Sequence, residues 1–117
     1  MMRCQHYVAK LQANTRYARA KLAAQNFKIS GETHIIPIFF NKDIQQVQRI
    51  SQWLMYRYRI WVVAVSHVAS PRLSVVINRL HTHEEIDRLV NALVEIREQI
   101  KHHGTLPPIQ DYLAAVA

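Results

Sequence analysis

The chain has 117 residues, half of them hydrophobic and a fifth charged, a composition typical of one globular domain and inconsistent with disorder. Its formal net charge of +7 gives a basic surface, and its single cysteine, Cys4, excludes an internal disulfide and a cysteine-type zinc site. No apolar run approaches the roughly 18 residues of a membrane span, and the N-terminus lacks the apolar core of a signal peptide, so the sequence predicts a cytoplasmic protein with a single domain over residues 1–117.

The first predicted element is a helix from about Gln5 to Gln25. Asn26 follows where a left-handed C-cap is expected, because asparagine tolerates that conformation best after glycine. One stripe of the helix is expected to face the core at helical spacing: Val8, Leu11, Thr15, Ala18 and Leu22.

Residues 34–40, HIIPIFF, predict a strand that contains a proline. Because proline cannot donate to a ladder, this is expected to be an edge strand or one broken at Pro37. Asp43 is the expected N-cap of a helix that runs to about Tyr56. The run IWVVAVS at 60–66 is β-branched and apolar on both faces, which is typical of a central strand.

The clearest local signal lies at residues 72–89. Apolar and polar side chains alternate as in a strand with one buried face. Thr82 then begins a capping box with Glu85. The helix that follows has an apolar stripe and ends near Gly104, with basic residues in its last turn. The stripe consists of Ile86, Leu89, Val90, Leu93, Ile96 and Ile100.

A short helix-like stretch, Ile109 to Val116, closes the chain. The order α-β-α-β-β-α predicts an α+β fold in which helices cover a small, mainly antiparallel, three-stranded sheet.

This order resembles the small C-terminal domain of the α-oxoamine synthases, a branch of the pyridoxal-phosphate (PLP) aminotransferase class I/II superfamily. The branch includes 8-amino-7-oxononanoate synthase, glycine C-acetyltransferase, 5-aminolevulinate synthase and serine palmitoyltransferase. The family's closing strand and helix read here as Arg72-Leu73-Ser74, His81-Thr82 and Glu84-Glu85-Ile86-Asp87. Earlier family segments read as Asn26-Phe27, Thr33-His34-Ile35-Ile36-Pro37-Ile38, Asn41-Lys42-Asp43, Arg59-Ile60-Trp61-Val62 and a shortened loop at Ser66-His67-Val68-Ala69.

Three turns of the family carry glycine, and this chain replaces each of them. Asn26 and Asn41 are the next best residues for a positive φ. Arg59, at the third turn, costs roughly 1 kcal/mol if its backbone is left-handed.

The resemblance implies one domain of a PLP-dependent transferase that condenses an acyl-CoA with an amino acid. In the family the Schiff-base lysine and the groups that hold PLP lie in the large domain, and no lysine here matches such a motif. The chain alone is therefore expected to bind no PLP and to be inactive, and it needs a large PLP-binding domain or homologous subunit as partner. It is interpreted as a fragment, a split subunit or a divergent relative. The segment at 60–62 and the final helix favour the 8-amino-7-oxononanoate synthase type.

The resemblance also identifies a substrate-binding position. The family's strand arginine, which grips the amino-acid carboxylate, is replaced by Ser74, which has neither the charge nor the reach. Arg72 lies on the same strand face, about 7 Å away, and is at best a weak substitute. An ordinary structural or solvated role accounts for Arg72 more simply.

The remaining candidate residues need no catalytic or metal-binding role to explain them. His81, His83 and Glu84 surround a helix corner without the spacing of a metal site, and Trp53 and Trp61 fit a core. No catalytic, cofactor-binding or metal residue is predicted. The alternative function is a non-enzymatic basic module that contacts nucleic acid or protein. Its arginines are scattered over several elements and no Gly-rich aromatic strand is present, which argues against nucleic acid.

Overall fold

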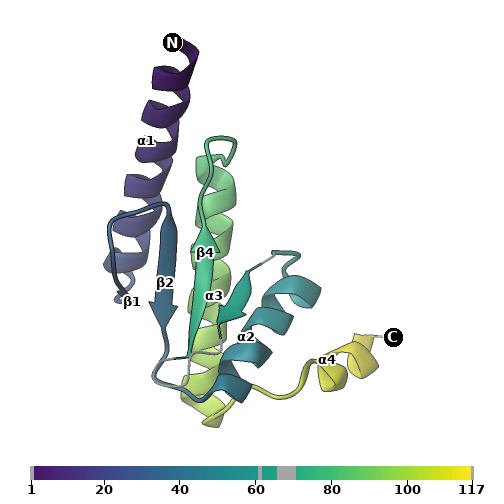
Figure 1. Ribbon diagram of the computed structural model, residues 1–117. Coiled ribbons are helices and arrows are strands. Elements are labelled where there is room, and N and C mark those ends of the chain that lie inside the picture. Colours follow the sequence, from purple (N-terminus) through teal and green to yellow (C-terminus); the bar gives the residue numbers. More distant parts are fainter. Residues whose placement is uncertain (1, 61, 66–70, 117) are drawn as a thin grey trace.

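The computed structural model describes residues 2–60, 62–65 and 71–116. It confirms the predicted α+β class and element order, and it adds one short strand (Figure 1). The elements are α1 (Met2–Ala24), β1 (Lys28–Ile29), β2 (Ile35–Phe39), α2 (Ile44–Arg57), β3 (Val63–Val65), β4 (Arg72–Val76), α3 (His83–His103) and α4 (Ile109–Val116).

The sheet is antiparallel throughout, with the strand order β1-β2-β4-β3. It therefore has four strands among the described residues, not the predicted three. Two expected positions are also wrong. β2 is interior, because β1 pairs with its residues Ile38 and Phe39. Pro37 is tolerated there because the two-residue β1 does not extend far enough to pair with it. Within the part of the chain that the structure describes, β3 pairs with β4 alone and is an edge strand, although its sequence suggested a central one.

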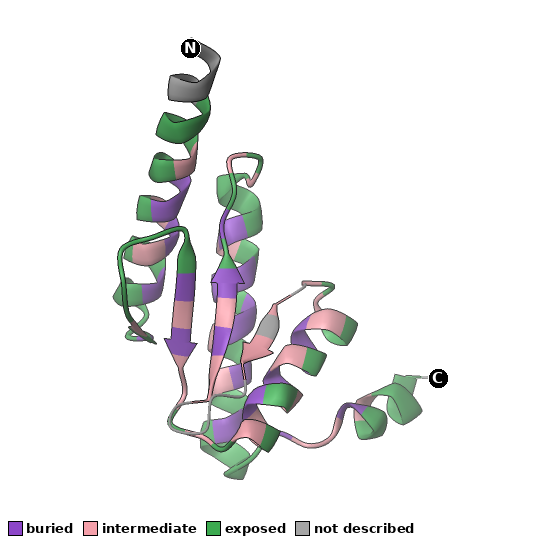
Figure 2. Ribbon diagram, viewed as in Figure 1, coloured by how far each residue is buried: buried purple, intermediate pink, exposed green. Residues whose placement is uncertain are grey.

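One face of the sheet forms the core. Ile36 and Ile38 of β2 and Leu73 and Val75 of β4 are buried, and α1 and α3 lie behind these two strands (Figures 1 and 2). α2 runs along β3 and completes the same hydrophobic cluster. All six residues of the predicted α3 stripe are buried, which confirms it: Ile86, Leu89, Val90, Leu93, Ile96 and Ile100.

α1 extends well past the sheet at its N-terminal end (Figure 1). Thr15, Ala18 and Leu22 of its predicted stripe are buried, but Val8 is 51% exposed. The prediction for Val8 is wrong because its side chain lies at an open hollow with Leu11 and His34 and not in the core. Among the described residues, no helix is both long and apolar enough to cross a membrane.

The helix ends follow the sequence signals. Asn26, with φ 64°, closes α1 in a Schellman motif, since the N–H of Phe27 donates to the carbonyl of Leu22. Asn41 has φ 55°, and Asp43 caps α2 by accepting from the N–H of Gln46.

α3 has the predicted signals at both of its ends. The capping box of Thr82 and Glu85 is formed, and Gly104 ends the helix at φ 75°.

The C-terminal segment is anchored by Trp53. The indole N–H donates to the carbonyl of Pro107 at 2.7 Å, and the ring packs 5.2 Å from that of Tyr112 in α4. Trp53 is buried, as the sequence predicts. Trp61 and the predicted short loop at Ser66–Ala69 lie outside the described residues.

Candidate functional site on the open face of the sheet

Ser74 belongs to the interior strand β4 and lies on the sheet face opposite the buried residues of that strand. Among the described residues, Figure 1 shows no helix over this face. Side chains alternate along β4, so Leu73 and Val75 enter the core and Arg72, Ser74 and Val76 point to the opposite face. Ser74 pairs with Pro37 on one side and with Val63 on the other. The position that the resemblance assigns to a carboxylate-binding arginine is thus half-buried among the strands.

Apolar side chains surround this position. On β2, Ile35, Pro37 and Phe39 share the face of Ser74, because the intervening Ile36 and Ile38 are buried. Ile35 is 46% exposed and Val76 is 53% exposed. We call Ile35, Pro37, Phe39, Arg72, Ser74 and Val76 the open face. An apolar sheet face of this kind is typical of a surface that packs against another protein element.

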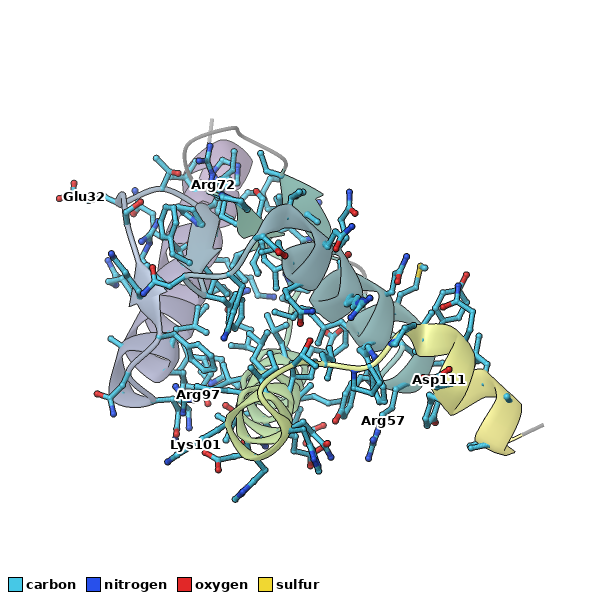
Figure 3. The ribbon with its side chains drawn as sticks, turned by 90° about the horizontal axis from the view of Figure 1, so that it is seen from below. Glu32, Arg57, Arg72, Arg97, Lys101 and Asp111 are labelled. Atoms are coloured by element: carbon cyan, nitrogen blue, oxygen red, sulfur yellow. The ribbon has the colours of Figure 1, made fainter. Side chains whose placement is uncertain are left out.

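Arg72 lies two residue pairs along the ladder from Ser74, and its side chain packs on a neighbouring ring. It pairs with Phe39 on β2, and its guanidinium carbon lies 5.9 Å from the centre of that ring. Arg72 projects from the end of β4 in Figure 3. The stacked position supports the structural role, while a substrate role for Arg72 or Ser74 stays a prediction.

The left-handed turn at Arg59 is stabilised by backbone and side-chain contacts. Arg59 has a φ of 59°, the left-handed conformation expected where the family carries glycine. The N–H of Ile60 donates to the carbonyl of Leu54 at 2.9 Å, and Arg88 donates to the carbonyls of Tyr58 and Arg59 at 3.2 and 3.3 Å. These bonds offset a backbone cost of roughly 1 kcal/mol. Arg88 therefore holds the connection that leads into β3.

Several other arginines also serve as donors to backbone carbonyls. Arg19 reaches the loop before β2 through Ser30 and Thr33, and Arg49 reaches Leu106 at 3.1 Å. The high basic content is therefore partly structural, which weakens the interpretation of a nucleic-acid surface.

α1 and α3 are joined by a polar cluster that the sequence did not reveal. Tyr17 donates to the Asp87 carboxylate at 2.6 Å, and Lys21 lies 3.5 Å from the same carboxylate. The Tyr17 ring stacks on His83 with centroids 3.8 Å apart. The hydrogen bond lowers the pKa of Asp87 and raises that of Tyr17. The two partners are 70 residues apart, so no spacing rule could have found them.

The histidines of the α3 corner have separate roles. The Nδ1 of His81 accepts from the N–H of Asn78 at 2.9 Å, while His83 stacks on Tyr17. Glu84 lies in the first turn of α3, where an acid suits the helix dipole. Within the described part of the chain, no three potential metal ligands lie together.

The residues present do not fit a PLP site. PLP enzymes need a Schiff-base lysine, an acidic partner for the pyridine nitrogen and donors for the phosphate. Lys10, Lys28 and Lys101 are exposed, Lys42 is half-buried in a turn, and Lys21 pairs with Asp87. The hollow that Lys28, Lys42 and Lys101 line contains no carboxylate.

Two curated mammalian proteins are similar to most of the sequence. Human mitochondrial 2-amino-3-ketobutyrate coenzyme A ligase is 34% identical over 105 residues, which cover 86% of this chain and 24% of the relative. The mouse protein of the same name is 31% identical over 112 residues, covering 92% and 26%. The chain thus spans about a quarter of the length of the curated relatives it matches. No protein-family model matches it.

Two solved structures share the fold. The 8-amino-7-oxononanoate synthase of Francisella tularensis matches with a TM-score of 0.67 and 20% identity, over 81% of this chain and 28% of that one. A structure described as SPT with a PLP internal aldimine matches with a TM-score of 0.66 and 19% identity, over 84% and 25%. In both cases the likeness is confined to about a quarter of the larger protein.

Proposed function

Because the chain is related in sequence and in fold to the C-terminal domain of the PLP-dependent α-oxoamine synthases, we propose that it serves as the small domain of an acyl-CoA:amino acid C-acyltransferase. The large PLP-binding domain supplies the cofactor and the bond-making groups. The chain described here supplies one wall of the site and is not catalytic by itself.

The observation that carries this proposal is the open face. The helices cover one side of the sheet, while Ile35 and Val76 on the other side remain about half exposed. Burying such a face stabilises an assembly by roughly 25 cal/mol per Å² of apolar area. A partner that covers this face would also enclose Ser74 and Arg72, so the assembled site would form against β2 and β4.

The proposal stays at the level of reaction class. The sequence relatives are named as 2-amino-3-ketobutyrate coenzyme A ligases and one structural neighbour as an 8-amino-7-oxononanoate synthase. These relatives belong to one family of PLP-dependent acyltransferases, but their names do not point to a common product. We therefore propose the reaction class alone, without the preference for the 8-amino-7-oxononanoate synthase type that the sequence suggested.

Co-expression tests the proposal directly. The chain is produced with the human 2-amino-3-ketobutyrate coenzyme A ligase shortened to its large domain, and the pair is purified through a tag on the large domain. We expect a stable complex that gains acyl-transfer activity absent from either piece. Failure of the chain to co-purify would contradict the proposed role.

A matched pair of substitutions tests the surface. Val76→Glu places a charge on the open face, and Val116→Glu places one on α4, at a valine that is 61% exposed. Both side chains are exposed in the isolated chain, so circular dichroism should show two folded variants. We expect Val76→Glu to abolish co-purification and Val116→Glu to preserve it. Equal behaviour of the two variants would show that the open face is not the docking surface.

A further inference from the structure

A basic hollow of about 350 Å³ lies at the end of the molecule opposite the N-terminus of α1. The turn after α1, the turn before α2 and the last turns of α3 form its walls. Figure 3 looks at this end and labels Arg97 and Lys101 on α3. The left-handed Asn26 and Asn41 also line the hollow, so the two sharp turns bring distant segments together there.

Four cations and no carboxylate line the hollow. The cations are Lys28, Lys42, Arg97 and Lys101. The ion pairs found among the described residues involve other cations, so none of these four is neutralised by an acid there. Arg97 is held in place because it donates to the carbonyl of Gln25 and stacks 4.3 Å from the centre of the Phe27 ring. One guanidinium is therefore positioned in advance, and three lysines surround it.

Helix dipoles do not account for all of this charge. Lys101 lies in the last turn of α3, where a cation is favourable. Lys28, however, belongs to β1, and Lys42 lies in the turn before α2. Neither is part of a helix C-terminus. Bringing like charges together is unfavourable unless an anion offsets the repulsion.

The hollow also has an aromatic wall. Phe27, Phe39 and Phe40 line it, and the rings of Phe27 and Phe40 lie 6.0 Å apart at an interplanar angle of 72°. Phe27 is buried, whereas Phe40 is half-buried and borders the hollow. The volume of the hollow is within the range of small-ligand sites, and such sites combine apolar walls with a few converging polar groups.

We propose that this hollow binds a nucleoside phosphate, with the lysines and Arg97 on the phosphates and the base against the phenylalanine rings. Cations bind phosphate oxygens through charge-assisted hydrogen bonds, and aromatic side chains stack on planar bases. The hollow holds no carboxylate that could pair with a pyridinium nitrogen, so it is not a PLP site of the kind discussed above. This binding does not depend on the proposed enzymatic role.

The test uses the whole chain and a fluorescent N-methylanthraniloyl derivative of ADP, followed by anisotropy. We expect saturable binding that ADP reverses. Adenosine and pyrophosphate should each compete at least roughly tenfold more weakly than ADP, since each supplies half of the contacts. The proposal would be overturned if binding did not saturate at millimolar concentrations of the protein. It would also be overturned if pyrophosphate competed as strongly as ADP.

Two double variants remove equal charge. Lys28→Gln with Lys101→Gln removes two cations from the hollow, and Lys10→Gln with Arg16→Gln removes two exposed cations from α1. The first pair should weaken binding by roughly tenfold or more and the second by less than twofold. Equal losses would mean diffuse attraction to a basic surface and would also overturn the proposal. All four residues have side chains on the surface or at its edge, so circular dichroism should confirm that both variants fold.

Discussion

Tyr17 on α1 donates its phenolic hydrogen to the carboxylate of Asp87 on α3, and the two oxygens are 2.6 Å apart. This bond belongs to the polar cluster that joins the two helices, together with the Lys21–Asp87 ion pair and the stacking of Tyr17 on His83. The bond is a hydrogen bond to a charged group, which is stronger than one between neutral groups.

Tyr17→Phe should therefore lower the melting temperature in a manner that depends on pH. The pKa of Asp87 is below its ordinary 3.8, so its contribution is present above that value and is lost as pH falls through the lowered pKa. The pKa of Tyr17 is above its ordinary 10.0, so its contribution is lost as pH rises through the raised pKa. The difference between wild type and variant should be largest near neutral pH and vanish at both extremes. A difference that does not vary with pH would assign the loss to packing alone.

The capping box predicts a second stability effect. Thr82→Ala removes the acceptor for the N–H of Glu85 and should cost about 1 kcal/mol in the free energy of unfolding, measured by urea denaturation. Thr82→Ser keeps the hydroxyl and should remain close to wild type. The Thr82 N–H lowers the pKa of Glu85, so the protection provided by the box should fade as pH falls through that lowered pKa. If serine and alanine prove equally damaging, the hydroxyl is not the stabilising group.

Substitutions at two residues with positive φ should change the stability of the chain in opposite directions. Arg59→Gly relieves a φ of 59° and should stabilise the chain by about 0.5 kcal/mol, after the greater flexibility of unfolded glycine is deducted. Gly104→Ala forces a side chain into a φ of 75° and should destabilise it by about 1 kcal/mol. Arg88 contacts the Arg59 carbonyl, which both residues provide, so that hydrogen bond survives. A loss of stability in Arg59→Gly would show that the arginine side chain itself is needed.

Ser74→Arg tests what the open face lacks. In the co-expressed complex, an arginine at this position should lower the KM for the amino acid by at least roughly tenfold, because a bidentate guanidinium–carboxylate pair replaces a hydroxyl. Ser30→Arg adds the same charge in an exposed loop and should leave the KM unchanged. Equal effects of the two substitutions would contradict a carboxylate site at Ser74.

Local signals predicted local structure well, and they failed where pairing between distant strands decides. Asn26, Thr82 and Gly104 each mark a helix end by their own backbone or side-chain chemistry, and all three were placed correctly. Pro37 suggested an edge and the run at 60–66 suggested a centre, yet the order β1-β2-β4-β3 reverses both. The order of strands in a sheet depends on which strands pair with one another. The composition of a strand indicates only whether its two faces are buried or exposed. β1 has two residues and leaves no pattern to detect.

The candidate site, like the fold, has features that the sequence predicts and features that it does not. The strand parity of Ser74 and Arg72 follows from the alternation along β4, so their common face could be predicted. The stacking of Arg72 on Phe39 and the joining of Lys28, Lys42 and Lys101 at one hollow could not, because these contacts arise only when separate elements pack.

The length of the two outer strands affects how readily this chain aggregates. Within the described residues, β1 and β3 contain two and three residues, so the outer strands themselves present few free amide and carbonyl groups. Long bare margins recruit strands from neighbouring molecules and lead to aggregation. The brevity of β1 and β3 therefore lowers the tendency of separate copies of this chain to aggregate through their outer strands.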